Sequence, residues 1–227
     1  MAKYKRLEVY KKILDKPIVP VFYNENIETV KSVITACYTG GVRVFEFTNR
    51  GDFAHEVFQE LSKWCRDSLA DMALGVGSIL DAPTAALYIQ CGADFVVSPY
   101  FTEEVARLCN SRQVGYIPGC GSVKEIGVAQ EFGAEIVKVF PAGNVGGPSF
   151  IKNVLGPLPW SRLMVTGGVE ATRESIETWF RSGVTCIGLG SKLFPKEVIV
   201  NKEWQRITEN CKRAFSYLPS ELVANSL

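Results

Sequence analysis

The sequence predicts an α/β fold, a (β/α)8 TIM barrel with an additional N-terminal helix. Short apolar segments alternate with longer amphipathic segments, eight of the apolar segments are present, and 227 residues are enough for one such domain. The apolar segments are rich in Val, Ile and Phe and are hydrophobic almost throughout, as are strands buried on both faces of a parallel sheet. We therefore expect a single barrel domain over residues 1–227.

The elements follow one another regularly along the chain. We expect an N-terminal helix at about residues 3–14 and a C-terminal helix at about residues 204–217 that packs back on the barrel. Helical spacing of apolar residues predicts helices between strands, such as residues 27–38, 53–66, 82–90, 123–132 and 173–180. The strands are expected at residues 18–23, 42–48, 72–78, 95–98, 115–118, 136–140, 162–166 and 186–189.

An open, doubly wound sheet is the alternative architecture. Such a sheet more often has about five to seven strands and a glycine fingerprint after the first strand. Here the first strand ends in Tyr23-Asn24-Glu25-Asn26, which contains no glycine. The barrel is therefore the preferred prediction.

The composition excludes several classes of protein. A formal net charge of +1 gives no indication of a nucleic acid or an anionic membrane as partner. No apolar stretch approaches the ~20 residues needed to span a bilayer, and residues 1–12 lack the apolar centre of a signal peptide. The seven cysteines form no C-x-x-C pair, which is expected of reduced thiols in a cytoplasmic protein. The single histidine, His55, argues against a histidine-rich zinc site, although carboxylate-bound Mg²⁺ or Mn²⁺ stays open.

Lys138 is the first candidate for a catalytic residue. It lies within the apolar strand predicted at residues 136–140. Burial removes hydration from an ammonium group, which lowers its pKa and frees its lone pair. A neutral lysine is the usual nucleophile for Schiff-base formation with a carbonyl substrate. The alternative is that the side chain reaches solvent or pairs with a carboxylate, because burying a charge is costly.

The second predicted strand contains a carboxylate, Glu46. Because side chains alternate along a strand, Glu46 shares the inward face with Val44 and Thr48, and Arg50 follows in the loop. A carboxylate inside a barrel is costly unless it is paired or takes part in chemistry. We expect Glu46 to relay protons beside Lys138, and Arg50 to bind a substrate carboxylate in bidentate fashion. A buried Glu46–Lys138 ion pair with a structural role is the alternative.

Polar residues and glycines follow other strands at the same end of the predicted barrel. Ser78 places a hydroxyl at the end of the third strand, where a turn explains it equally well. Gly167 and Gly168 follow the seventh strand, and Gly190 and Ser191 follow the eighth. Backbone N–H groups at these two places often bind phosphate in barrels of this class. Either glycine segment alone would fit a tight turn, and the two together favour an anion site.

These segments together resemble the class I, Schiff-base aldolases that cleave 2-keto-3-deoxy-6-phosphogluconate and 4-hydroxy-2-oxoglutarate. The resemblance extends over about residues 17–194. Its most specific parts are Glu46-Phe47-Thr48-Asn49-Arg50 and Lys138-Val139-Phe140-Pro141-Ala142. Supporting parts are Val19-Pro20-Val21, Gly40-Gly41, Thr166-Gly167-Gly168, Gly190-Ser191 and residues 75–78, 92–99 and 117–120.

The resemblance implies a role for each matched residue. Lys138 corresponds to the Schiff-base lysine and Glu46 to the general acid/base of the family. Arg50 and Ser78 match positions that hold the pyruvate carboxylate, and Phe140 belongs to the substrate-binding set. The phosphate-binding positions are matched by Gly167, Gly168, Gly190 and Ser191.

The resemblance also implies a small-molecule 2-keto acid substrate, pyruvate as product, a homotrimer, and neither metal nor cofactor. The chain departs from the family pattern at Ser78 (usually threonine), Asn49 (leucine), Tyr100 (glycine) and Cys120, within a segment that is usually valine-threonine. Tyr100 and Cys120 are expected near the mouth, where they bear on specificity rather than mechanism. The choices between gluco and galacto substrates, and between phosphorylated sugar acids and 4-hydroxy-2-oxoglutarate, stay open.

Two other functions are compatible with the same barrel. A phosphate-sugar isomerase or synthase would use Glu46 as a base without covalent chemistry, and would keep activity when Lys138 is replaced by arginine. A non-catalytic sugar-acid binding protein would bind ligand without turning over any 2-keto acid.

Overall fold

The protein forms the predicted barrel in a computed structural model that describes residues 2–219. Nine parallel strands make one sheet, in the order β5-β4-β3-β2-β1-β9-β8-β7-β6. Their bounds are β1 (Ile18–Phe22), β2 (Val44–Thr48), β3 (Ala73–Gly77), β4 (Phe95–Val97), β5 (Gly115–Ile117), β6 (Gly119–Cys120), β7 (Val137–Val139), β8 (Leu163–Thr166) and β9 (Cys186–Leu189).

The two end strands of this sheet, β5 and β6, are consecutive in the chain and are separated only by Pro118. The fifth strand expected at residues 115–118 contains β5, and β6 continues the same segment beyond it. The two are interrupted where proline has no N–H to donate to a neighbouring strand. One half pairs with β4 and the other with β7, and the Pro118 carbonyl accepts a 2.8 Å hydrogen bond from the Lys138 amide. This segment thus connects the two edges of the sheet and closes it into a barrel, so the barrel prediction is confirmed.

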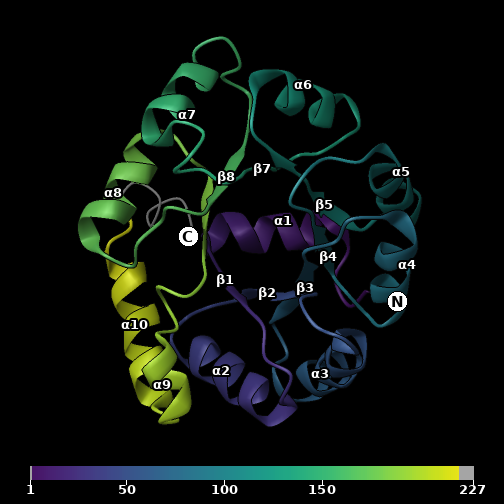
Figure 1. Ribbon diagram of the computed structural model, residues 1–227, viewed down its shortest axis with the longest axis vertical. Coiled ribbons are helices and arrows are strands. Elements are labelled where there is room, and N and C mark those ends of the chain that lie inside the picture. The colour runs from purple at the N-terminus through teal and green to yellow at the C-terminus, as the bar shows by residue number, and fades with distance from the viewer. Residues whose placement is uncertain (1, 220–227) are drawn as a thin grey trace.

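Helices surround the barrel in a ring (Figure 1). The C-terminal helix is confirmed almost to the residue, the N-terminal helix begins later than expected, and the short α9 was not predicted. None of the described helices is both long enough and apolar enough to cross a bilayer. The bounds are α1 (Arg6–Asp15), α2 (Ile27–Thr39), α3 (Ala54–Ser68), α4 (Ala82–Gln90), α5 (Glu103–Arg112), α6 (Val123–Glu131), α7 (Gly147–Leu155), α8 (Arg173–Arg181), α9 (Lys196–Val200) and α10 (Trp204–Ser216).

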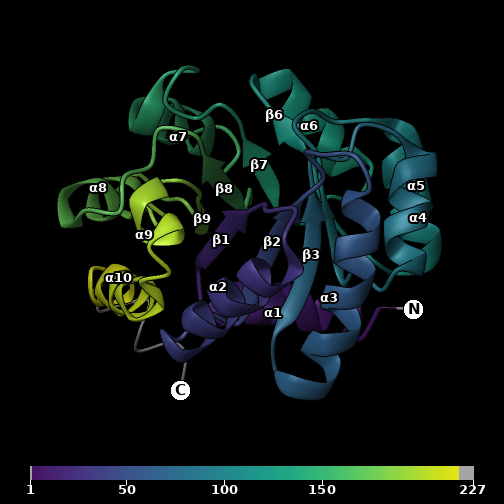
Figure 2. The same cartoon turned by 60° about the horizontal axis from the view of Figure 1, so that its bottom comes forward.

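The N-terminal helix α1 closes one end of the barrel. In Figure 1 it crosses the centre of the ring, and Figure 2 places it below the strands. Its apolar face, formed by Val9, Tyr10 and Ile13, is buried against side chains at the beginnings of the strands, such as Val44 and Ile136. The end of the barrel that α1 leaves uncovered is the opposite one, where the strands end.

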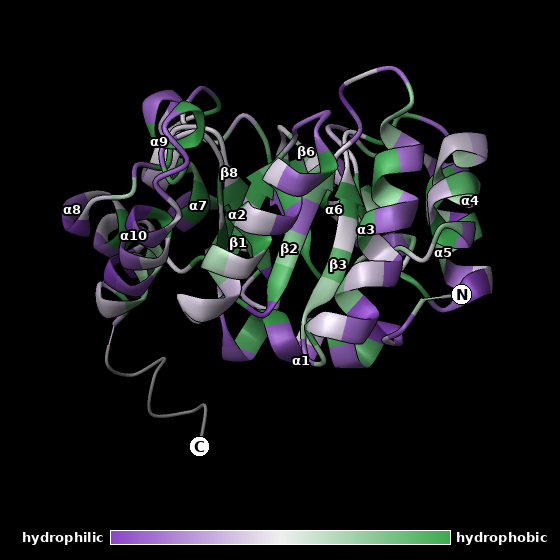
Figure 3. Cartoon of the chain, turned by 90° about the horizontal axis from the view of Figure 1, so that it is seen from below, coloured by the Kyte–Doolittle hydropathy of each residue, from purple (hydrophilic) through white to green (hydrophobic). Residues whose placement is uncertain are grey.

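The strands separate two apolar layers. Phe45 and Phe47 belong to the large outer cluster between sheet and helices, whereas Val44 belongs to the inner cluster around α1. Figure 3 shows the strands mostly in hydrophobic colours, with hydrophilic residues on the surrounding helices. The alternation along β2 turns Glu46 inward, as expected. Lys138 is inward for the same reason, because its neighbours Val137 and Val139 both lie in the outer layer.

Candidate active site

A cavity of about 470 Å³ lies at the end of the barrel opposite α1. Its wall comes from the C-terminal ends of β1, β2 and β8 and from the loops that follow these strands, β7 and β9. Six of the nine residues predicted for the site line it: Arg50, Phe140, Gly167, Gly168, Gly190 and Ser191.

Lys138 and Glu46 lie one layer deeper than this cavity. Lys138 lies on β7, two positions before the lining residue Phe140, which directly follows that strand. Glu46 precedes the lining residue Thr48 by two positions on β2. The lysine Nζ lies 4.7 Å from the centroid of the Phe140 ring. Only 6% of Lys138 and 1% of Glu46 is exposed. Both groups therefore sit below the cavity, shielded from bulk solvent.

Burial shifts both ionisable groups toward their neutral forms. Loss of hydration lowers the pKa of Lys138; the Glu46 carboxylate opposes this shift, and Arg50 adds to it. Loss of hydration likewise raises the pKa of Glu46, against the opposing charges of Lys138 and Arg50. Within residues 2–219 no ion pair of 4.0 Å or less joins Lys138 to Glu46. Both shifts are thus toward a neutral amine and a neutral carboxyl group, and no short ion pair between the two groups offsets them.

Three inward polar atoms have no hydrogen-bond partner among the described residues: Oε2 of Glu46, Oγ1 of Thr48 and Oγ1 of Thr166. Buried polar groups are nearly always paired, so unpaired ones call for an explanation. Thr48 and Thr166 line the cavity, and Glu46 lies just below it. These atoms are well placed to bind a polar ligand in the lumen.

The carboxylate of Glu46 depends on a glycine in the neighbouring strand. On β3, Gly77 lies beside it, and a methyl group there would overlap Oε1 and the terminal carbons of Glu46. Gly77 therefore makes room for the acid inside the barrel. A glycine within a buried strand is a signal that can be seen in the sequence. In this segment, however, the sequence indicated only Ser78 as a site residue.

Arg50 and Ser78 follow neighbouring strands but differ in their placement. Arg50 is exposed at the cavity mouth and lines it. Ser78 is half-buried outside the cavity lining, with φ of 62°, and begins the turn after β3. The turn after β3 and the loop after β2 are adjacent, because the Asn49 amide donates a 2.9 Å hydrogen bond to the Gly77 carbonyl.

The glycines after β8 form a tight wall of the cavity. Gly167 and Gly168 have φ of 84° and 86°, a conformation that favours glycine. A Cβ on Gly168 would lie 2.8 Å from the Cα of Gly143, so only a bare backbone fits. Gly190 and Ser191 face the same cavity from the loop after β9. The two glycine segments do come together, as an anion site requires.

Several lining residues were not predicted. Phe22 and Tyr23 come from the end of β1, and an ion pair of 3.0 Å between Glu170 and Lys192 closes one side. Exposed charges in loops give no periodic signal, so sequence alone could not locate this pair. Within the described part of the chain, no group of three or more His, Cys, Asp or Glu side chains could hold a metal ion.

Neither of the two departures expected near the mouth lines the cavity. Cys120 is 2% exposed and packs in the outer layer with Val137 and Val139, so it faces the helices and not the substrate. Burial raises the pKa of its thiol to about 12. Tyr100 is 51% exposed and does not line the cavity. The expectation that Cys120 lies near the mouth was wrong, because the strand alternation turns its side chain outward.

The model of one enzyme family, the KDPG and KHG aldolases, matches residues 9–210. The chain belongs to the KDPG and KHG aldolase family. This match extends over the whole barrel, from α1 into α10, and it confirms the family expected from the lysine and glutamate motifs.

Individual members of the KDPG and KHG aldolase family are similar along most of their length. The 2-dehydro-3-deoxy-phosphogluconate aldolase of Pseudoalteromonas atlantica is 32% identical over 87% of this chain and 89% of its own. The KHG/KDPG aldolase of Escherichia coli is 29% identical over 87% and 90%. A crystal structure of the KDPG aldolase of Legionella pneumophila, with pyruvate captured as a covalent carbinolamine, is 27% identical, with a TM-score of 0.80 and coverage of 90% and 97%.

Proposed function

We propose that the chain is a class I aldolase that cleaves a 2-keto-3-deoxy-6-phospho sugar acid, or 4-hydroxy-2-oxoglutarate, to pyruvate and an aldehyde. The observation that supports this most strongly is the pair of Lys138 and Glu46, buried beneath the cavity with both pKa values shifted toward the neutral forms. A neutral amine can attack a ketone, and a carboxyl group of raised pKa can both donate and accept protons near neutral pH.

The substrate spans the cavity, with its carboxylate bound at one end and its phosphate at the other. Arg50 binds the carboxylate of the keto acid, with the hydroxyl of Ser78 assisting, because a guanidinium suits bidentate binding of a carboxylate. Backbone N–H groups at Gly167, Gly168 and Gly190, with Ser191, bind the phosphate. Phe140 covers the Lys138 Nζ and contacts the pyruvate part of the substrate, which keeps water away from the reacting atoms.

The reaction begins with Schiff-base formation. The Lys138 Nζ attacks the C2 ketone and gives a carbinolamine, and Glu46 supplies the proton with which the C2 hydroxyl leaves as water. The resulting iminium carries a positive charge beside C3. This charge accepts the electron pair of the C3–C4 bond when that bond breaks.

Bond cleavage and product release complete the cycle. Glu46, directly or through a water molecule, removes the proton of the C4 hydroxyl, so that C4 leaves as an aldehyde: glyceraldehyde 3-phosphate or glyoxylate. The enamine that stays on Lys138 is protonated at C3 by the same carboxyl group. Hydrolysis of the iminium then releases pyruvate and restores the amine.

The proposal includes the setting in which the enzyme acts. The protein works in the cytoplasm as a homotrimer and needs neither metal nor cofactor. Sedimentation of the purified chain at micromolar concentration tests the assembly: a trimer is expected, and a monomer at all concentrations would contradict it.

Pyruvate release from the candidate substrates tests the activity directly. The unaltered chain should release pyruvate from at least one of 2-keto-3-deoxy-6-phosphogluconate, its galacto isomer and 4-hydroxy-2-oxoglutarate. Lys138→Arg should lose turnover. Glu46→Gln should keep residual activity, since general acid–base assistance contributes about 10²–10⁴-fold. Full activity of Lys138→Arg would favour an isomerase-type mechanism without covalent chemistry. Ligand binding without turnover would indicate a binding protein.

A further inference from the structure

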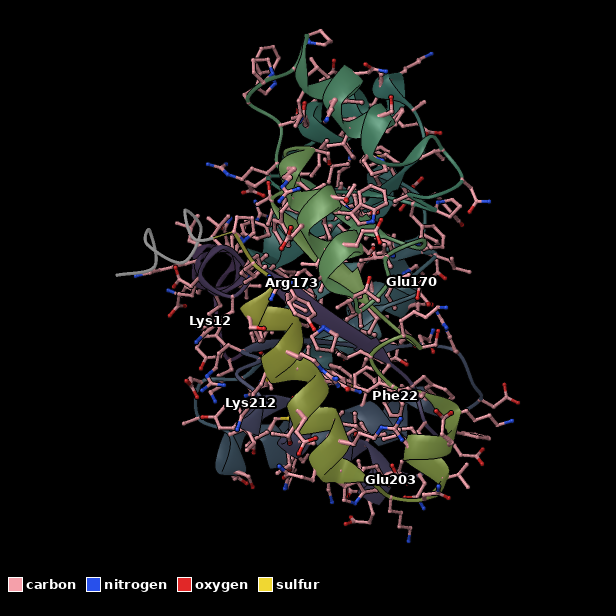
Figure 4. All side chains as sticks on the ribbon, turned by 90° about the vertical axis from the view of Figure 1, so that its left-hand side faces the viewer. Lys12, Phe22, Glu170, Arg173, Glu203 and Lys212 are labelled. Carbon is pink, nitrogen blue, oxygen red and sulfur yellow. The ribbon has the colours of Figure 1, made fainter. Side chains whose placement is uncertain are left out.

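A second cavity, of about 350 Å³, lies outside the barrel between α8, α10 and the loop after β9. Its size falls within the range of about 300–1,000 Å³ typical of small-molecule sites. Figure 4 looks onto this side of the molecule, with Arg173 near the C-terminal end of α10 and Glu170 beyond it. This cavity is separate from the one proposed for catalysis, and among residues 2–219 only Lys192 lines both.

Four cationic side chains converge on this cavity from three parts of the chain. Arg173 comes from the first turn of α8, Lys192 from the loop after β9, and Arg206 and Arg213 from α10. No carboxylate is among the described residues that line it. A concave surface lined by charges of one sign concentrates the electrostatic field and attracts ligands of the opposite sign.

The polar face of α10 forms one wall of this cavity. Arg206, Asn210, Arg213 and Tyr217 recur at the spacing of one helix face, and all four line the cavity. The opposite face of the helix contains the buried residues that pack on the barrel helices, among them Cys211. Asn210 accepts a 2.6 Å hydrogen bond from Nη2 of Arg213, and the Arg173 guanidinium lies 4.7 Å from the Tyr217 ring centroid. These contacts orient both arginines at the cavity.

The carboxylates that pair with these cations lie outside the cavity lining. Arg173 pairs with Glu177, Lys192 with Glu170, and Arg206 with Glu203, at 3.0–3.1 Å. In the described part of the chain Arg213 has no carboxylate within 4.0 Å. All three pairs are at least partly exposed, so each is weak and can yield to a more highly charged ligand.

The first turn of α8 adds a further positive contribution. Ala171, Thr172 and Arg173 line the cavity at the N-terminal end of this helix. Thr172 caps the helix by accepting a hydrogen bond from the Ser175 amide. The positive end of the helix dipole thus faces the same space as the four cations.

We propose that this cavity is a second anion site, specific for a small polyanion with two phosphoryl groups. Two phosphoryl groups carry more negative charge and more acceptor oxygens than one, and so match three guanidinium groups and an ammonium group more closely. Arginine suits this ligand because its planar guanidinium binds phosphate oxygens in bidentate fashion. The site is additional to the phosphate position in the proposed active site, and its occupation does not depend on aldolase activity.

Calorimetric titration of the full chain with inorganic pyrophosphate tests the proposal at constant ionic strength of about 0.1 M, where unspecific surface attraction is screened. Arg213→Gln should raise the Kd of one class of sites about fivefold or more, because a hydrogen bond to a charged group is lost. The double variant Arg206→Gln, Arg213→Gln should abolish pyrophosphate binding to that class of sites. Lys212→Gln is the matched control, because it removes one charge from the residue of α10 that directly precedes Arg213. Lys212 does not line the cavity and lies on the flank of α10 away from Glu170 (Figure 4).

The outcomes separate clearly. Weaker binding in Arg213→Gln with unchanged binding in Lys212→Gln supports the site. Equal binding in the wild type, Arg213→Gln and the double variant overturns it, because the only pyrophosphate bound would then be elsewhere. Equal weakening by Arg213→Gln and Lys212→Gln also overturns it, since unspecific charge attraction would explain the binding. Circular dichroism confirms that the variants are folded.

Discussion

Lys138 and Glu46 are two ionisable side chains that the fold removes almost completely from water. Each would be more stable as an ion in solvent, and their shifted pKa values express this cost. A chain selected only for stability would place apolar side chains at these positions. Retention of both groups beneath a cavity is therefore best explained by chemistry, and it leads to predictions about stability and about pH.

The double variant Lys138→Met, Glu46→Gln should unfold at a higher urea concentration than the wild type at pH 7. Replacing two buried ionisable groups by neutral side chains of similar size is often neutral or stabilising by about 1–4 kcal/mol. The single variants provide the cycle that isolates the coupling of the two groups. A double variant less stable than the wild type by several kcal/mol would support the structural ion pair instead.

The sign of the pH dependence follows from the two shifts. The raised pKa of Glu46 gives stability that is present below its unfolded pKa and is lost as pH rises through its folded pKa. The lowered pKa of Lys138 gives stability that is present above its unfolded pKa and is lost as pH falls through its folded pKa. In the Lys138→Met background, the stability gained by Glu46→Gln should therefore grow as the pH is raised from about 4 toward and beyond neutral. Urea titrations across this pH range measure the stability gained by Glu46→Gln. A gain in stability that becomes smaller as the pH rises would show that the pKa of Glu46 is lowered in the folded state and not raised.

At the residue scale, alternation along a strand was sufficient to turn Lys138 and Glu46 inward. It was sufficient because strands buried on both faces tolerate a charge only where the lumen has room. The same rule was not applied to Cys120, whose side chain faces outward. The unpaired hydroxyl of Thr166 and the ion pair of Glu170 with Lys192 depend on where loops and strand ends meet, which no local pattern contains.

At the scale of elements, β3 supplies the space that the acid on β2 occupies. Gly77→Ala should therefore displace the Glu46 carboxylate and lower the rate of pyruvate release about as strongly as Glu46→Gln. Gly127→Ala is the matched control. Gly127 lies in helix α6, and a Cβ there would meet no atom of the described residues within 4 Å. That control should keep activity and gain up to about 1 kcal/mol of stability. Full activity of Gly77→Ala would show that the position of Glu46 is not decisive.

Helix α1 should be required for stability rather than chemistry, since it closes the end of the barrel farthest from the cavity. Ile13 is fully buried there, so Ile13→Ala should lower the free energy of unfolding by about 2–5 kcal/mol while the folded protein keeps its kcat. Leu7, which is 75% exposed on the same helix, is the control, and Leu7→Ala should change stability by no more than about 0.5 kcal/mol. Urea unfolding and steady-state kinetics together check this. Equal effects of the two changes would contradict the role given to α1.

The elements differ in how far the sequence could predict them. The apolar periodicity located α10 and seven of the eight expected strands as continuous segments, because each is long enough or apolar enough to show its period. Pro118 in the fifth segment was a visible signal for an interrupted strand. That α1 packs across the base of the barrel could not be predicted, because an amphipathic pattern specifies a buried face and not its partner.

At the scale of the whole molecule, the order of strands determines where chemistry can occur. Parallel strands end together, so residues far apart in the sequence, such as Glu46 on β2 and Lys138 on β7, meet toward one end of the barrel. The number of expected strands predicted a barrel, and the barrel architecture predicted that Glu46 and Lys138 lie close together. The second cavity was not predictable in the same way, because it depends on how α8 and α10 are placed outside the sheet.

Borohydride reduction in the presence of pyruvate tests the central claim, that Lys138 is a neutral nucleophile open to a ketone. Mass spectrometry of the intact chain and of its peptides should show one stable adduct, located at Lys138 and missing from Lys138→Arg. The yield at fixed time should fall as the pH is lowered through the depressed pKa of Lys138. An unmodified chain, or an adduct on any other lysine, would contradict the account.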